Sequence, residues 1–285
     1  MAAIESNPKI SLHMRSNSFP TAPHPVVSQF EEHLNRLKSS ESASSSSSLS
    51  HKLCGLQDLQ DSSDKLLQLS TTQQVFAQDC SQKCIDELLE GSLRLLDICS
   101  TAKDCLVESK ESLYEVQSAI RRRGTEAAFT VGAANYLASR KNVKKAIRKA
   151  LGNIKGIRND LIVKENDMLS MLKEAEAVTV STFESLLCFI CNQKGQSKQS
   201  RKSAISKLMQ PKRGGCDSQE RGTSEFEKVD AALKSLIRQK HASTDNLQGD
   251  LENLEMCIQD LETGVECLSR KLIRTRVSIL NIFNN

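Results

Sequence analysis

Apolar residues recur at every third or fourth position along most of this chain, which is the period of an α-helix with one buried face. The pattern predicts helices over 26–38, 53–69, 81–122, 125–191 with a break near Gly152 and Gly156, 224–241 and 243–283. A helix over 81–122 would be about 60 Å long at 1.5 Å per residue, so such helices must pack along one another. We therefore expect an all-α protein, an elongated antiparallel bundle of long helices with coiled-coil character.

The most regular pattern lies in the last predicted helix, 243–283. Its apolar residues alternate steps of four and three, as in the a/d seam of a coiled coil. They are Leu247, Leu251, Leu254, Ile258, Leu261, Val265, Leu268 and Leu272. We expect this coiled-coil seam to be buried, and a homodimer is one of the arrangements that would cover it.

The N-terminal part of the chain predicts flexibility rather than packing. Residues 1–25 hold four of the five prolines and show no apolar period, so we expect a disordered tail. Nine of the twelve residues in 39–50 are Ser, which favours a linker after the short helix over 26–38. The remainder, 51–285, is expected to form one helical bundle domain with a basic loop at about 192–222.

Composition argues against an enzyme. The chain has no Trp, 12 Gly and 4% aromatic residues, which a broad core with a substrate pocket does not favour. It contains no HExxH, GxGxxG, GxxxxGK[ST] or GxSxG motif, and four of its five His lie in the first 51 residues. We expect a protein that is not an enzyme and that holds no metal or cofactor.

Targeting signals are weak in this sequence. The first 30 residues contain no continuous apolar stretch, and the longest apolar run, Leu186–Cys191, is far shorter than the roughly 20 residues of a spanning helix. Ten Cys in a chain of 285 residues do not form the dense pattern of a small secreted domain. We expect a cytoplasmic protein, and attachment to a membrane surface, the nucleus and the plastid stay open as alternatives.

A formal net charge of +4 hides blocks of opposite sign. Residues 58–115 hold 12 acids against 5 bases, and 121–158 hold 11 bases against one acid. Within the basic block, six cations follow one another at helical spacing beside an apolar stripe: Arg140, Lys141, Lys144, Lys145, Arg148 and Lys149.

This basic stripe predicts docking to an anionic surface, either membrane lipid or an acidic protein partner. The alternative is internal neutralisation by the acidic helices of 58–115 or 217–266. Nucleic acid is the less favoured partner, because only Tyr136 accompanies the stripe and no nucleic-acid-binding pattern surrounds it.

Cys188 and Cys191 form a lone CxxC motif. Thioredoxin-type chemistry needs a βαβ context and a zinc site needs a second ligand pair, and the sequence offers neither. We expect both residues to be small apolar members of a helix. Lipidation is the alternative, because the motif ends the most apolar run and cations follow it.

The N-terminal segment Arg15–Pro20 has the arrangement Arg-Ser-x-Ser-x-Pro, which 14-3-3 proteins bind when the second Ser is phosphorylated. A phosphate brings about two negative charges to an Arg-lined groove. We therefore predict a phosphosite at Ser18, with Arg15 and Pro20 as its other determinants, and an unmodified tail is the alternative.

Three separated segments form a further pattern: His13–Pro20 with His24-Pro25, the central Tyr136–Lys145, and Leu272–Ile282 near the end. Together these segments resemble the Bypass-related proteins of plants. The resemblance implies an all-helical plant protein, a part in root and shoot development, and no catalytic residues. Asn142 stands where the family's basic run is expected to carry Lys. The resulting hypothesis is a helical scaffold or adaptor, and its alternative is a peripheral membrane protein.

Overall fold

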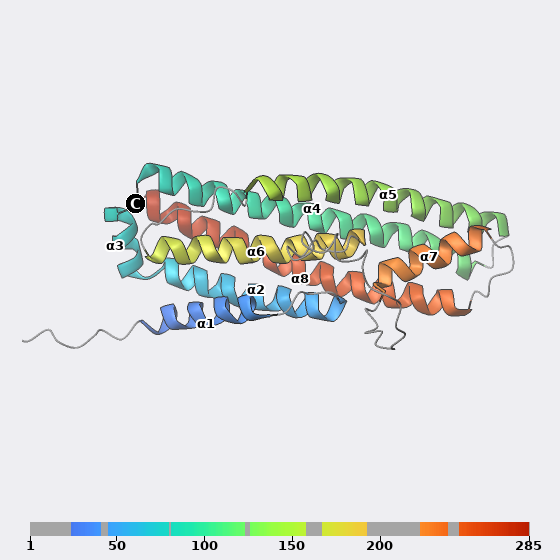
Figure 1. The fold of residues 1–285 in the computed structure, drawn as a ribbon, viewed down its shortest axis with the longest axis horizontal. Helices are drawn as coiled ribbons and strands as arrows, with labels where there is room; N and C mark the ends of the chain where they lie inside the picture. Colours follow the sequence, from blue (N-terminus) through green and yellow to red (C-terminus); the bar gives the residue numbers. More distant parts are fainter. Residues whose placement is uncertain are drawn as a thin grey trace, which may run out of the picture.

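The computed structural model describes residues 24–40, 45–79, 81–122, 126–157, 167–192, 223–238 and 245–284. Within these ranges the chain forms no strand and eight helices: α1 (Pro25–Ser39), α2 (Ser46–Leu67), α3 (Ser70–Asp79), α4 (Gln82–Arg121), α5 (Glu126–Ile157), α6 (Asp167–Cys191), α7 (Glu225–Arg238) and α8 (Asp245–Asn284). The long helices lie side by side along one axis in an elongated bundle (Figure 1). The predicted all-α bundle is confirmed.

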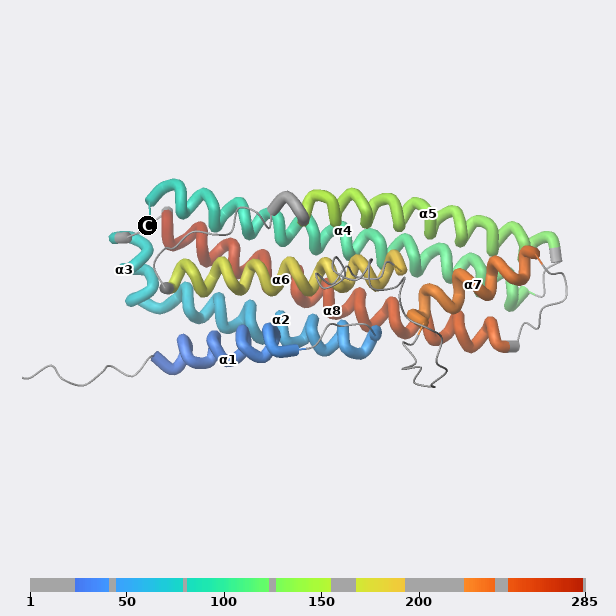
Figure 2. The backbone as a smooth tube through the Cα atoms, viewed as in Figure 1, coloured from blue at the N-terminus to red at the C-terminus, as the bar shows by residue number. Residues whose placement is uncertain are grey.

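Helix α4 runs the length of the bundle, and α5 returns antiparallel beside its second half (Figure 2). Ser139 on α5 donates to the Glu108 carboxylate on α4 over 3.0 Å, which fixes the register between the two helices. The predicted stretch over 125–191 is divided into α5 and α6 after Ile157. Gly152 lies inside α5.

Helix α8 lies between α2 and α4 and supplies much of the core. All eight residues of the coiled-coil seam are buried. They are covered by helices of the same chain: Gln57 on α2 donates to the Gly264 carbonyl over 3.3 Å, and the Cys99 thiol on α4 donates to the Val265 carbonyl over 3.6 Å. The seam therefore offers no apolar surface to a second copy.

Helix α2 begins at Ser46, inside the run that the sequence assigned to a linker. The Ser45 hydroxyl accepts from the backbone N–H of Ser48 over 3.3 Å, and the Ser48 hydroxyl accepts from the backbone N–H of Ser45 over 3.2 Å. This capping box satisfies two donors at the helix start, and burial of Leu49 one turn later adds apolar contact. Local capping and burial outweigh the low helix propensity of Ser here.

None of the helices in the described ranges has the length and apolar character that crossing a bilayer requires.

Candidate docking face on α5

The inner face of α5 has a regular buried register. Its apolar members are Ala133, Tyr136, Val143, Ile147, Leu151 and Ile154. Position 140 falls in the same register, between 136 and 143. The sequence grouped Arg140 with the basic stripe, for which internal neutralisation was the alternative to docking. Only 1% of the residue is exposed, because the backbone register directs it inward, so Arg140 is not part of a docking surface.

Arg140 is held by groups from two other helices, α6 and α7. Its Nε donates to the Asp230 carboxylate on α7 over 3.1 Å, and its Nη2 donates to the carbonyl of Ile190, in the last turn of α6, over 2.7 Å. The guanidinium carbon lies 4.5 Å from the centre of the Phe226 ring, also on α7. A buried cation is tolerated only with such partners, and this one joins α5, α6 and α7.

Lys144, one turn further along α5, shares the same carboxylate. Its Nζ donates to Asp230 over 2.7 Å, and its side chain is largely covered. Two of the six predicted stripe cations are therefore neutralised internally by an acid of the 217–266 block. For these two, the alternative of internal pairing is the one that the structure supports.

Tyr136 completes this buried polar cluster. Burial raises the pKa of its hydroxyl, so the phenol stays protonated at neutral pH. Its oxygen and Nη1 of Arg140 are buried without a hydrogen-bond partner among the described residues. The neutral phenol of Tyr136 and the Asp230 carboxylate, which pairs with both Arg140 and Lys144, are suited to holding α5 against α7.

The other four stripe cations lie on the outer face of α5. Lys141, Lys145, Arg148 and Lys149 are exposed, and within the described part of the chain they make no hydrogen bond or ion pair. We call this group the outer cationic face. Its exposed neighbours on α5 are small or uncharged: Ala134, Ala138, Asn142 and Gly152. Four unpaired charges thus project from a rigid helix into solvent.

The buried cysteines that the structure describes offer little chemistry in this environment. Cys191 is buried, and its thiol donates to the Cys188 carbonyl over 3.5 Å, which does not favour an acyl chain at that position. Burial raises the pKa of Cys99 and Cys105 to about 11 and that of Cys257 to about 12. These three thiols are protonated at neutral pH and are poor nucleophiles.

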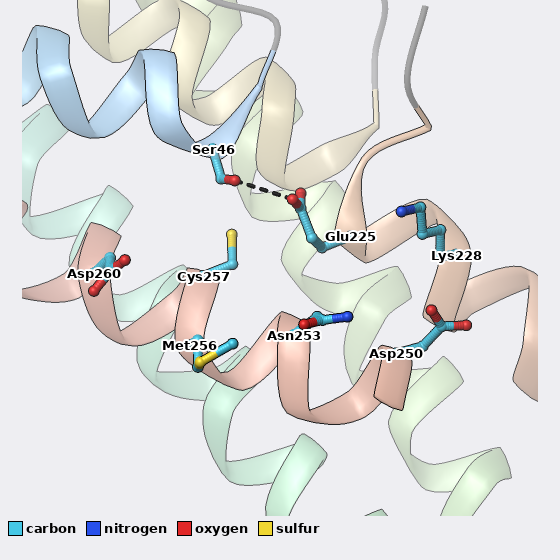
Figure 3. Close-up of a pocket in the computed structure, with 8 residues that line it drawn as sticks. All are labelled: Ser46, Glu225, Lys228, Asp250, Asn253, Met256, Cys257 and Asp260. Atoms are coloured by element: carbon cyan, nitrogen blue, oxygen red, sulfur yellow. Dashed lines mark hydrogen bonds between the residues drawn. The ribbon is translucent and has the colours of Figure 1, made fainter. Parts of the chain in front are cut away.

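A shallow cavity of about 260 Å³ lies where the first turns of α2 and α7 meet α8 (Figure 3). Ser46 donates to the Glu225 carboxylate across it over 3.0 Å. Its lining consists of Ser46, Glu225, Lys228, Asp250, Asn253, Met256, Cys257 and Asp260. No group of three or more His, Cys, Asp or Glu in the described ranges is placed to hold a metal ion, so this cavity has carboxylates without metal-ligand geometry.

Two aspects of the site bear on the sequence predictions. Ser18, Arg15 and Pro20 lie outside the described residues. Asp230, the carboxylate that binds both inward cations, was not identified from the sequence. The available signal was an acid directly beside the apolar series Phe226, Val229 and Leu233, all of which are buried.

Comparison with known protein families identifies a relationship. A family model described as Protein BPS1 matches residues 52–282, from α2 to the last turn of α8. No curated protein and no solved structure matches the chain.

Proposed function

The chain belongs to the Bypass-related family, and from this premise we propose that it is a non-enzymatic helical adaptor in the regulation of plant root and shoot development. The adaptor binds an acidic surface of a partner protein through the outer cationic face of α5. Membership of the family supports the developmental setting, and the division of charge on α5 supports the binding surface.

The observation that carries the proposal is the contrast between the two faces of one helix. Arg140 and Lys144 share Asp230 inside the bundle, whereas Lys141 and Lys145, each one position further along, have no partner in the described ranges. Exposed cations that repel one another do nothing for the stability of the isolated protein. They become favourable when an acidic surface approaches them.

A protein partner fits this face better than a lipid bilayer does. The apolar side of α5 is buried in the bundle, so α5 cannot insert it among acyl chains. Four cations near an anionic bilayer contribute roughly 4 kcal/mol, which corresponds to a dissociation constant on the order of 1 mM. A protein surface adds hydrogen bonds and apolar contacts to the same charge attraction.

The test replaces Lys141, Lys145 and Lys149 by Gln in the full chain. Partners purified from plant tissue with wild-type protein should be lost with this variant, and a purified partner should bind the wild type in a salt-sensitive way. Thermal stability should be unchanged or slightly raised, because self-repulsion on α5 is relieved.

The control variant carries Lys65→Gln, Lys83→Gln and Lys234→Gln. These three Lys are exposed on other helices, so the control has the same net charge and should retain the partner. Lower thermal stability with binding unaltered would show that the α5 cations act inside the bundle and would overturn the proposal. Binding of the wild type to phosphatidylserine liposomes, with no protein partner sensitive to the α5 variant, would favour the membrane function instead.

A further inference from the structure

Helices α4 and α8 share a second surface, formed by other residues than the outer cationic face. On α8, Nη1 of Arg276 donates to the Ser92 hydroxyl over 2.6 Å and to the Leu89 carbonyl, both on α4. Nearer the middle of the bundle, Lys103 on α4 pairs with Glu266 on α8 over 2.7 Å. These contacts fix which turns of the two antiparallel helices face each other.

Apolar residues flank both members of the Arg276–Ser92 contact at the same offsets. Relative to each of these two positions, residues at −3, +1 and +4 lie on one side of the helix. They are Ile273, Val277 and Leu280 on α8, and Leu89, Leu93 and Leu96 on α4. We call these six residues the apolar strip.

The apolar strip is open to solvent. Leu93 is 47% exposed, Ile273 51% and Val277 47%, and the other three are half-buried. Contiguous exposed apolar residues, unlike single scattered ones, are typical of interaction surfaces.

Helices α2 and α6 contact α8 and α4 through ion pairs of residues outside the strip. Helix α2 contacts α8 through ion pairs of Asp61 with Lys271 and Arg274. Helix α6 contacts α4 through Lys173 with Glu87 at 2.9 Å and Glu176 with Arg94 at 3.2 Å. The exposure of Leu93, Ile273 and Val277 shows that no described helix covers these three residues.

An acidic edge runs beside the strip along α4. Asp86, Glu90 and Asp97 are exposed and lie with Leu93 at steps of four, three and four. Arg94 pairs with the Glu90 carboxylate at 3.7 Å and with the Glu176 carboxylate on α6 at 3.2 Å. The edge therefore keeps a net negative charge.

We propose that the apolar strip binds an amphipathic helix of a partner protein, with apolar residues at i, i+4 and i+7 facing the strip and Lys or Arg along the side that meets the acidic edge. The three strip residues on α4 and the three on α8 each follow the i, i+4, i+7 pattern, which spans about 10 Å of helix. A partner helix would lie between these two rows, in the helix-in-groove mode. This inference rests on the proposed adaptor function and adds a second binding surface, of opposite charge preference, to the one on α5.

The test uses the full chain and two fluorescent synthetic helices. Both carry Leu at i, i+4, i+7 and i+11, one with Lys and the other with Glu at the flanking positions. In fluorescence anisotropy the Lys peptide should bind at least about tenfold more tightly than the Glu peptide. Leu93→Ser with Val277→Ser should weaken binding of the Lys peptide by at least about tenfold, because two apolar contacts that the bound peptide would bury are removed.

Matched variants separate the strip from general stickiness. Met256→Ser with Val131→Ser changes two residues that are each 59% exposed but lie elsewhere, and it should leave the affinity unchanged. Asp86→Asn with Glu90→Gln and Asp97→Asn should reduce the preference for the Lys peptide. Thermal unfolding confirms that each variant is folded, and all changed residues are exposed.

Equal binding of the two peptides, or undiminished binding to the Leu93→Ser, Val277→Ser variant, would overturn the inference. Self-association of the wild type in sedimentation, lost in that variant, would overturn it in favour of a second copy as the occupant. The variant with Gln at positions 141, 145 and 149 should still bind the Lys peptide. A wrong proposal for the apolar strip would therefore show in peptide binding, and a wrong proposal for the outer cationic face would show in partner purification.

Discussion

Glu176 on α6 places a carboxylate directly against the backbone of α4. A Cβ added to Gly91 would lie 2.4 Å from Oε2 of Glu176, so a larger residue at position 91 would require this carboxylate to move. Arg94 pairs with the carboxylate over 3.2 Å, yet burial of the carboxyl group still raises its pKa. The reason for Gly at position 91 of α4 is not visible in the sequence, because Glu176 belongs to a helix more than 80 positions away.

The raised pKa of Glu176 predicts a pH-dependent stability difference. The folded state holds this proton more tightly than the unfolded state, so the associated stability is present below the unfolded pKa and is lost as pH rises through the folded value. A Glu176→Gln variant has no carboxyl group at this position, so its stability does not fall in this way as the pH rises. We expect the free energy of unfolding of the variant, relative to wild type, to increase between about pH 4 and pH 7, measured by urea denaturation.

Glu90→Gln is the matched control, since it removes an exposed carboxylate that pairs with the same Arg94. A constant difference between Glu176→Gln and wild type across this pH range would contradict the assigned burial of Glu176.

At the scale of helices, α8 is the element on which the bundle depends most. Ile258→Asp with Leu261→Asp would put two charges into its fully buried seam, and we expect a loss of at least about 4 kcal/mol in the free energy of unfolding. Circular dichroism during heating should show a lower melting temperature or no folded state. Gln259→Asp with Thr263→Asp, at exposed positions of the same helix, should melt near wild type. An unchanged melting temperature of the seam variant would contradict its burial.

Periodicity predicts the inward face of each helix well but not what covers it. The 4–3 spacing in 243–283 identified all eight buried seam residues, whereas the covering helices α2 and α4 became known only from the structure. Arg140 shows the opposite failure: residue type suggested solvent, and the register of its neighbours, which placed it inward, was the better guide. The apolar strip could not be predicted, because Leu89 and Leu96 look like ordinary members of a buried stripe until the position of α8 is known.

At the scale of the whole molecule, the two proposed binding surfaces are joined to an N-terminal segment that carries the predicted phosphosite. A phosphopeptide covering Lys9–Pro25 with phosphate on Ser18 should bind purified 14-3-3 protein, because the phosphate meets an Arg-lined groove. Arg15→Ala or Pro20→Ala in the same peptide should weaken binding by at least about tenfold in calorimetry. Equal binding of the phosphorylated and unmodified peptides would contradict the site.

The position of α8 between α2 and α4 also has a consequence for how the chain is made. Gln57 and the Gly264 carbonyl that it contacts are separated by 207 residues. At about 5 to 20 residues per second, a ribosome needs roughly 10 to 40 seconds to span that interval. During this time α2 has been synthesised, but α8, which covers one side of it, has not. Apolar residues such as Leu53, which packs beside Gly264, therefore lack their α8 contacts in the nascent chain. We expect them to need protection from aggregation until α8 has been synthesised.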